Sequence, residues 1–219
     1  MTMIVELKQK VLEASEAAAV SRKRPADRYS AMKYPKWPAL MRFAVDQYDL
    51  EGFGHLMSMH TTTKMGMELI TFSFMPKEGL TVPYFLLDAM SMKKKRCVFA
   101  EFYGCGYEPL SEEALFSVHE KYASLPEYAE KENWYIRERR PYSLIKTGEE
   151  GDLIKMAEDM TRAYLAGISG AGKDPAYAKK LLAFRERMIT EGNPSSKTLT
   201  MLLGADGAVQ FMKDVVMPV

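Results

Sequence analysis

The sequence predicts an α+β domain in which helices cover one antiparallel sheet. Segments that alternate polar and apolar residues follow one another in the first half of the chain with short connections, as antiparallel strands do. Helical patterns occupy the start of the chain and most of its second half, and this segregation is typical of layered α+β proteins. Because 219 residues suit one globular domain, we treat residues 1–219 as a single unit.

The first half begins with an amphipathic helix, predicted over residues 3–20 from apolar positions at helical spacing. The basic, proline-containing stretch 21–40 is predicted to be more loop than helix. Residues 55–76 alternate around the tripeptide KMG, which predicts two strands joined by a turn. Residues 82–92 and 96–104 add two further strands, with lysines at the turn between them.

The second half is mostly helical. Helices are predicted over residues 110–125, 149–168 and 175–190, and a short strand is predicted within residues 139–148. One stripe of the 149–168 helix carries four apolar side chains: Leu153, Met156, Met160 and Tyr164. Two apolar segments between residues 197 and 219 close the chain.

The stretch GISGAGKDP, residues 167–175, has the glycine and lysine spacing of a phosphate-binding loop. Such a loop needs a strand before the glycines and a serine or threonine after the lysine. Here the glycines follow a predicted helix, and Asp174 would place an anion beside the phosphates. We therefore predict a connection between two helices and keep a nucleotide-dependent enzyme only as a third hypothesis.

Composition excludes several classes of function. A net charge of +1 gives no overall attraction to nucleic acid or to a membrane surface. Cys97 and Cys105 have neither a CxxC pattern nor metal-ligand spacing. No apolar run approaches the roughly 20 residues of a transmembrane helix. We therefore expect a cytoplasmic monomer that holds no metal.

One acidic residue, Asp88, lies among apolar and aromatic neighbours in VPYFLLDAMSM. If its carboxyl group is buried, loss of hydration raises its pKa, and the protonated acid can deliver a proton near neutral pH. If instead it points outward at a strand end, it only caps a turn. Spacing alone leaves both readings open.

Other polar groups are less distinctive. His55, His60 and His119 are scattered and form no two-ligand helix pair. Basic residues crowd the stretches 137–140 and 93–96. Such runs are usually solvated turns, but gathered on one side of a nearly neutral domain they could bind carboxylates or an acidic protein.

Several stretches, taken in order, share motifs with one known family. The block FSFMPKEGLTVPYFLLDAMSM keeps that family's spacing of two prolines and an aspartate, here Pro76, Pro83 and Asp88. SLPEY is similar to its Leu-Pro-Glu-Trp motif, and SSKT is similar to its Asn-Asp-Lys-Thr motif, followed by a comparable C-terminal tail. Over roughly residues 55–219 the chain resembles the ferredoxin-dependent bilin reductases.

This resemblance implies a three-layer α/β/α sandwich with a central antiparallel sheet. It also implies an open-chain tetrapyrrole held between the sheet and the C-terminal helices. Enzymes of this family carry no flavin or metal. Reduced ferredoxin, an acidic external donor, supplies single electrons, the bilin itself becomes the radical, and the protein supplies protons.

The resemblance also assigns roles to residues. Asp88 matches the family's proton-donating aspartate. Lys197 matches a lysine that pairs with a substrate propionate, and Lys146 lies near the position of a propionate-binding arginine. We add Arg140, from the arginine run, as a further candidate for substrate binding.

The chain departs from the family at several positions. Thr71 stands where a catalytic histidine is expected, and we keep it and His60 as candidate catalytic residues. Met59 stands where a glutamate is expected, and Ser195 and Ser196 replace the first two residues of the Asn-Asp-Lys-Thr motif. These three are candidate substrate-binding residues, and a second proton donor is missing or lies elsewhere.

Two functions are therefore open. The first is ferredoxin-driven reduction of biliverdin or a related bilin, with Asp88 as proton donor. The alternative is a tetrapyrrole carrier on the same fold without reductase activity, which the incomplete set of proton donors favours.

Overall fold

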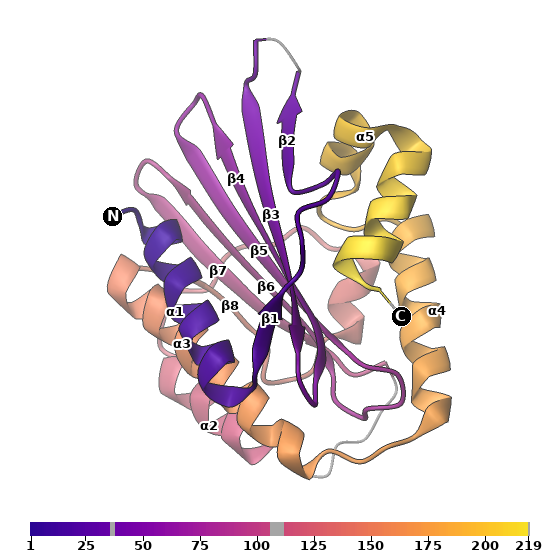
Figure 1. The fold of residues 1–219 in the computed structure, drawn as a ribbon. Coiled ribbons are helices and arrows are strands. Elements are labelled where there is room, and N and C mark those ends of the chain that lie inside the picture. Colours follow the sequence, from indigo (N-terminus) through magenta and orange to yellow (C-terminus); the bar gives the residue numbers. More distant parts are fainter. Residues whose placement is uncertain (36–37, 106–111, 219) are drawn as a thin grey trace.

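The computed structural model describes residues 1–35, 38–105 and 112–218. Its centre is an eight-stranded sheet with helices on both faces (Figure 1). All strand pairs are antiparallel, in the order β1-β3-β4-β5-β6-β7-β8, and β2 pairs with part of β3. The strands are β1 (Ser21–Lys23), β2 (Ala31–Tyr34), β3 (Met41–Leu50), β4 (Gly54–Thr63), β5 (Met67–Pro76), β6 (Tyr84–Met92), β7 (Lys95–Tyr103) and β8 (Leu144–Thr147).

One face of the sheet packs against α1 (Met3–Ala18), α2 (Glu113–Tyr122) and α3 (Glu150–Ala166). The strands contribute a layer of aromatic rings to this core, and Phe85 stacks on Phe102 with ring centroids 4.2 Å apart. The apolar stripe of α3 lies against them, and all four of its predicted members are buried. This face is therefore closed by tightly packed apolar side chains.

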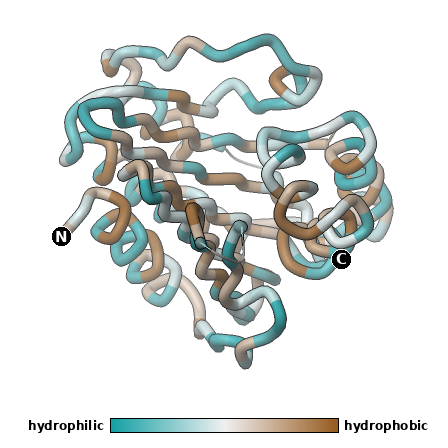
Figure 2. The backbone as a smooth tube through the Cα atoms, turned by 90° about the horizontal axis from the view of Figure 1, so that it is seen from above, coloured by the Kyte–Doolittle hydropathy of each residue, from teal (hydrophilic) through white to brown (hydrophobic). Residues whose placement is uncertain are grey.

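The other face packs against α4 (Pro175–Thr190), α5 (Ser196–Phe211) and a π-helical turn (Met212–Val216). A 3₁₀ helix, Trp134–Glu138, also lies on this side. Strands β3 to β7 alternate residues between the two cores, and the helices carry apolar and polar residues on different sides (Figure 2). The three-layer α/β/α prediction is confirmed.

The middle strands and most helices lie where the sequence predicts them, but the prediction for residues 21–40 is wrong in part. That stretch contains β1 and β2, which pair only with β3, and the sequence prediction left β3 itself out. Short strands at one edge of a sheet are held by register with their neighbour rather than by their own hydrophobic pattern. The sequence of 21–40 alone therefore does not reveal them.

The prediction for GISGAGKDP is confirmed. Residues Gly167–Gly170 form a 3₁₀ turn at the end of α3, so the glycines follow a helix. Asp174 caps α4, because its Oδ1 accepts a hydrogen bond of 2.8 Å from the backbone N–H of Ala176. Pro175 occupies the first turn of that helix, where its missing N–H costs nothing.

The closed face should dominate stability. Leu87 on β6 is fully buried in that core, so Leu87→Ala should lower the free energy of unfolding by about 2–5 kcal/mol. Leu40, which is 50% exposed, provides a matched control, and Leu40→Ala should change it by about 0.5 kcal/mol or less. Urea unfolding followed by circular dichroism measures both, and equal losses would contradict this assignment of the core.

Candidate functional site

On the sheet face that packs against α4 and α5, side chains from successive strands form a row. The antiparallel register pairs Met59 with Thr71, Thr71 with Asp88, and Asp88 with Phe99. Directly paired residues point to the same side of a sheet, so these side chains stand next to one another. The row therefore faces α4 and α5, opposite the closed core.

Asp88 is the acid in this row. The Oγ1 of Thr71 donates a short hydrogen bond to Oδ1 of Asp88. Burial raises the pKa of Asp88 to about 7, the hydrogen bond from Thr71 opposes this rise, and the nearby charge of Glu101 adds to it. Near neutral pH a large share of the Asp88 carboxyl groups is therefore protonated.

A cavity of about 430 Å³ opens over this row. Its floor is apolar sheet surface, its side is aromatic (Phe99, Tyr128 and Tyr135), and the start of α5 forms its roof. Ser195, Thr198 and Leu199 line that roof, because positions three and four apart share one helix face. A second hollow of about 30 Å³ reaches towards Met188 and Phe211 and shares Asp88 and Thr71 with the larger one.

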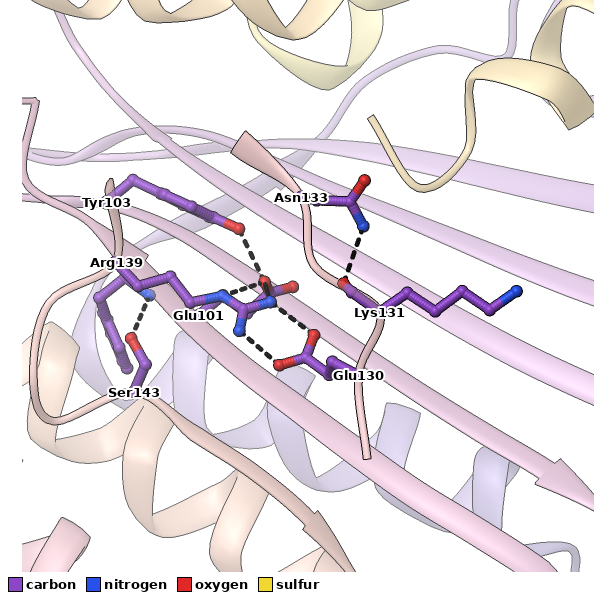
Figure 3. Close-up of polar contacts among 8 residues, drawn as sticks. Glu101, Tyr103, Glu130, Lys131, Asn133, Arg139 and Ser143 are labelled. Carbon is purple, nitrogen blue, oxygen red and sulfur yellow. Dashed lines mark hydrogen bonds and ion pairs between the residues drawn. The ribbon is translucent and has the colours of Figure 1, made fainter. Parts of the chain in front are cut away.

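An ion cluster in which the Glu101 and Arg139 side chains are buried lines part of the cavity (Figure 3). Arg139 lies between Glu101 and Glu130; its Nε donates to Oε1 of Glu101 at 2.7 Å. Its two terminal nitrogens donate to the two oxygens of Glu130 at 2.5 and 2.7 Å, a bidentate arrangement. The hydroxyl of Tyr103 also donates to Oε1 of Glu101, at 2.7 Å. One guanidinium thus faces two carboxylates.

The structure places four predicted site residues at the cavity: Asp88, Thr71, Met59 and Ser195. Ser196 follows Ser195 at the start of α5 and lines a separate hollow together with Ile189 and Val209. Lys197 is exposed on a different side of α5 from the cavity-lining residues, so the structure does not bring it into the cavity.

His60, Lys146 and Arg140 are not in the cavity, which corrects three predictions. His60 neighbours Met59 in β4 and points to the opposite face, where it lies 4.0 Å from Glu68. Lys146 pairs with Val98 of the closed core, and its Nζ donates to the carbonyls of Ala123 and Leu125 just past the end of α2.

Arg140 is held elsewhere by a bidentate pair with Glu112, at 3.0 and 2.8 Å. Arg139 has an extended backbone and forms an isolated bridge with Tyr103, and consecutive side chains of extended backbone point to opposite sides. Arg139, its neighbour, is the arginine that reaches the cavity.

Sequence reasoning missed Glu101, Glu130 and Arg139. Glu101 had a usable signal, because it is a lone acid in the apolar strand RCVFAEFYG, just as Asp88 is in its own strand. Glu130 lies in a connecting segment without a pattern, and only the fold brings it to Arg139.

The described residues contain no group of three or more His, Cys, Asp or Glu side chains arranged to hold a metal ion. Within the same residues, no helix is both long enough and apolar enough to cross a membrane.

No known protein-family model and no curated protein sequence matches the chain. Solved structures do match it. The crystal structure of phytochromobilin synthase from tomato in complex with biliverdin superimposes with a TM-score of 0.75. The match covers 95% of this chain and 80% of that chain at 16% sequence identity. At this identity the likeness establishes a shared fold.

The raised pKa of Asp88 should be visible in the pH dependence of stability. Between pH 3.8 and about 7 the native state retains a proton that the unfolded chain has released. The Asp88 contribution to the free energy of unfolding therefore falls as pH rises through this range.

Asp88→Asn removes that contribution, so the variant should gain stability relative to the unmodified protein between pH 4 and pH 7. The exposed Asp206→Asn controls for the loss of one acidic side chain. Denaturant unfolding at a series of pH values measures the difference. If the free energy of unfolding depends on pH in the same way in Asp88→Asn and in the unmodified protein, the pKa of Asp88 is not raised by burial.

Proposed function

We propose that this protein binds an open-chain tetrapyrrole in the cavity over Asp88 and reduces it. The observation that carries the proposal is a carboxyl group with a pKa of about 7 on the wall of a largely apolar cavity. The fold is shared with a protein whose crystal structure contains biliverdin. The sequence motifs around Pro76, Pro83 and Asp88 point to the same class of ligand.

The cavity suits such a ligand in size and in lining. A volume of about 430 Å³ falls within the range of roughly 300–1,000 Å³ typical of small-molecule sites. The rings of Phe99 and Tyr128, with centroids 5.0 Å apart, stand at its side and can contact flat pyrrole rings. The apolar sheet surface beneath would exclude water from the ligand.

The proposed reaction adds two electrons and two protons to the conjugated system of the bilin. Two reduced ferredoxin molecules, external to the protein, each give one electron and become oxidised. Asp88 gives the first proton from its carboxyl group and is left as a carboxylate, and a water molecule that enters from solvent gives the second proton. Solvent protons restore the Asp88 carboxyl group after turnover. Protonation makes the ligand more positive and therefore easier to reduce.

The alternative is a carrier that binds the tetrapyrrole without reducing it. It is favoured by the positions of the two other predicted catalytic residues. The hydroxyl of Thr71 already donates to Asp88, and His60 points to the far side of the sheet. Neither of them can supply the second proton from its present position.

Anaerobic incubation with a panel of bilins and a ferredoxin-reducing system separates the two functions. Both predict a shift of the visible absorption band when the bilin binds. Reduction predicts, in addition, a new pigment two mass units heavier, identified by absorption and mass. A shift without a new pigment supports the carrier, and the absence of any shift refutes both.

Asp88→Asn tests the proton donor. The variant should still bind the bilin, because the amide has the same shape, but turnover should fall by at least about 100-fold, as expected for a lost general acid. Absorption titration measures binding, and single-turnover pigment formation measures reduction. Undiminished turnover would remove Asp88 from the mechanism.

For ferredoxin docking we propose the lysines at the β6–β7 turn. Lys93, Lys94 and Lys95 are exposed, and the turn adjoins the end of the cavity lined by Met67, which pairs with Met92. The arginine run at 137–140 is less suitable, because its three arginines are each engaged with glutamates.

Lys94→Glu should raise the KM for reduced ferredoxin by about ten-fold at low ionic strength while leaving kcat nearly unchanged. The difference should shrink as salt is added, because salt screens charges on the surface. Lys155→Glu, at an exposed position on α3 across the sheet from the cavity, is the matched control. If both substitutions have equal effects, the turn is not the docking surface.

A further inference from the structure

Glu101 is an acidic side chain of the cavity wall, and the proposed reaction does not use it. It lies on β7, where it pairs with Leu86, while Asp88 on β6 pairs with Phe99. The two acids are therefore diagonal neighbours on the same face of the sheet, a placement that separates Cβ atoms by roughly 7–8 Å or somewhat less. Glu101 is only 2% exposed and lines the cavity together with Asp88.

The two carboxylate oxygens of Glu101 have different surroundings. Oε1 accepts from the hydroxyl of Tyr103 and from two nitrogens of Arg139. Oε2 has no hydrogen-bond partner among the residues that the structure describes, and Figure 3 shows it without a dashed line. Three donors thus fix the orientation of the side chain and leave one oxygen for another partner.

The positive charge of Arg139 does not fully compensate the negative charge of Glu101, because Arg139 also donates two hydrogen bonds to the carboxylate of Glu130. One positive group is shared by two carboxylates, so the cluster carries an excess of one negative charge when both are ionised. The titratable and charged groups that face Glu101 from the surrounding elements are Tyr84, Asp88, Tyr103, Glu130, Tyr135 and Arg139. Arg139 is the cation in this set.

We propose that Oε2 of Glu101 binds a protonated nitrogen of the tetrapyrrole and is the counter-ion of the protonated ligand. Glu101 lines the cavity, and a cationic N–H of a bound ligand would supply Oε2 with a charge-assisted hydrogen bond. Asp88 delivers the proton, and Glu101 stabilises the positive charge that results. The inference rests on the proposed function and adds a positioning role for the Arg139–Glu101 pair.

The experiment is a pH titration of the visible absorption of biliverdin bound to the full-length protein. Glu101→Gln keeps the shape but removes the charge, so the pKa of the bound pigment should fall by at least about one unit, a ten-fold loss of proton affinity. Glu68→Gln, at a position on the opposite face of the sheet near His60, is the matched control and should leave that pKa unchanged.

Tyr103→Phe is the second variant, and it keeps the inference testable if Glu101→Gln does not fold. It removes one donor from Oε1, so the negative charge on Glu101 is less stabilised and the pKa of the bound pigment should rise. A purely structural role for the cluster would not shift the pigment pKa in opposite directions in the two variants.

The outcomes separate the two proposals. If the unmodified protein does not bind biliverdin, the proposed function fails and the role of Glu101 fails with it. If it binds biliverdin but the pigment pKa is the same in Glu101→Gln, or does not rise in Tyr103→Phe, only the role of Glu101 is overturned.

Discussion

The register of β5, β6 and β7 is the constraint on which the rest of the structure depends. It places Thr71 beside Asp88 and Glu101 one diagonal step away, all on the face that turns away from α1 and α3. A slip of one residue in β6 would turn Asp88 into the aromatic core and expose Leu87 to the cavity. The same hydrogen-bond ladder that stabilises the sheet therefore also fixes the chemistry of the site.

The two faces of the sheet differ in packing: one holds a tightly packed core and the other contains the cavity. On one face, stacked rings such as Phe85 and Phe102 pack with the apolar stripe of α3 in a continuous core. On the other face, α4 and α5 cover the sheet incompletely and leave a cavity beside Asp88. A tightly packed core can support a neighbouring face that contains a cavity and a few polar side chains, because most of the free energy of folding comes from the buried apolar area.

Electrostatics at the cavity depend on how the charges are paired rather than on how many there are. Arg139 is buried, yet two glutamates compensate its charge, so the cavity wall is not positive. Burial raises the pKa values of both Asp88 and Glu101; the charge of Glu101 adds to the rise at Asp88, and the charge of Arg139 opposes the rise at Glu101. The net result is a wall that favours protons and cationic groups over anions.

The sequence by itself determined the class of fold, the middle strands and most helices, and it singled out Asp88 as a candidate, because each rests on a local pattern or on one acid in an apolar strand. Only the tertiary structure decided that Lys146 and His60 face away from the cavity, that Arg139 rather than Arg140 reaches it, and that Glu101 and Glu130 share that arginine. Which face a side chain takes depends on register, and which segments meet depends on packing. Both are set by contacts between residues far apart in the chain, such as Glu101 with Arg139, and no local pattern encodes them.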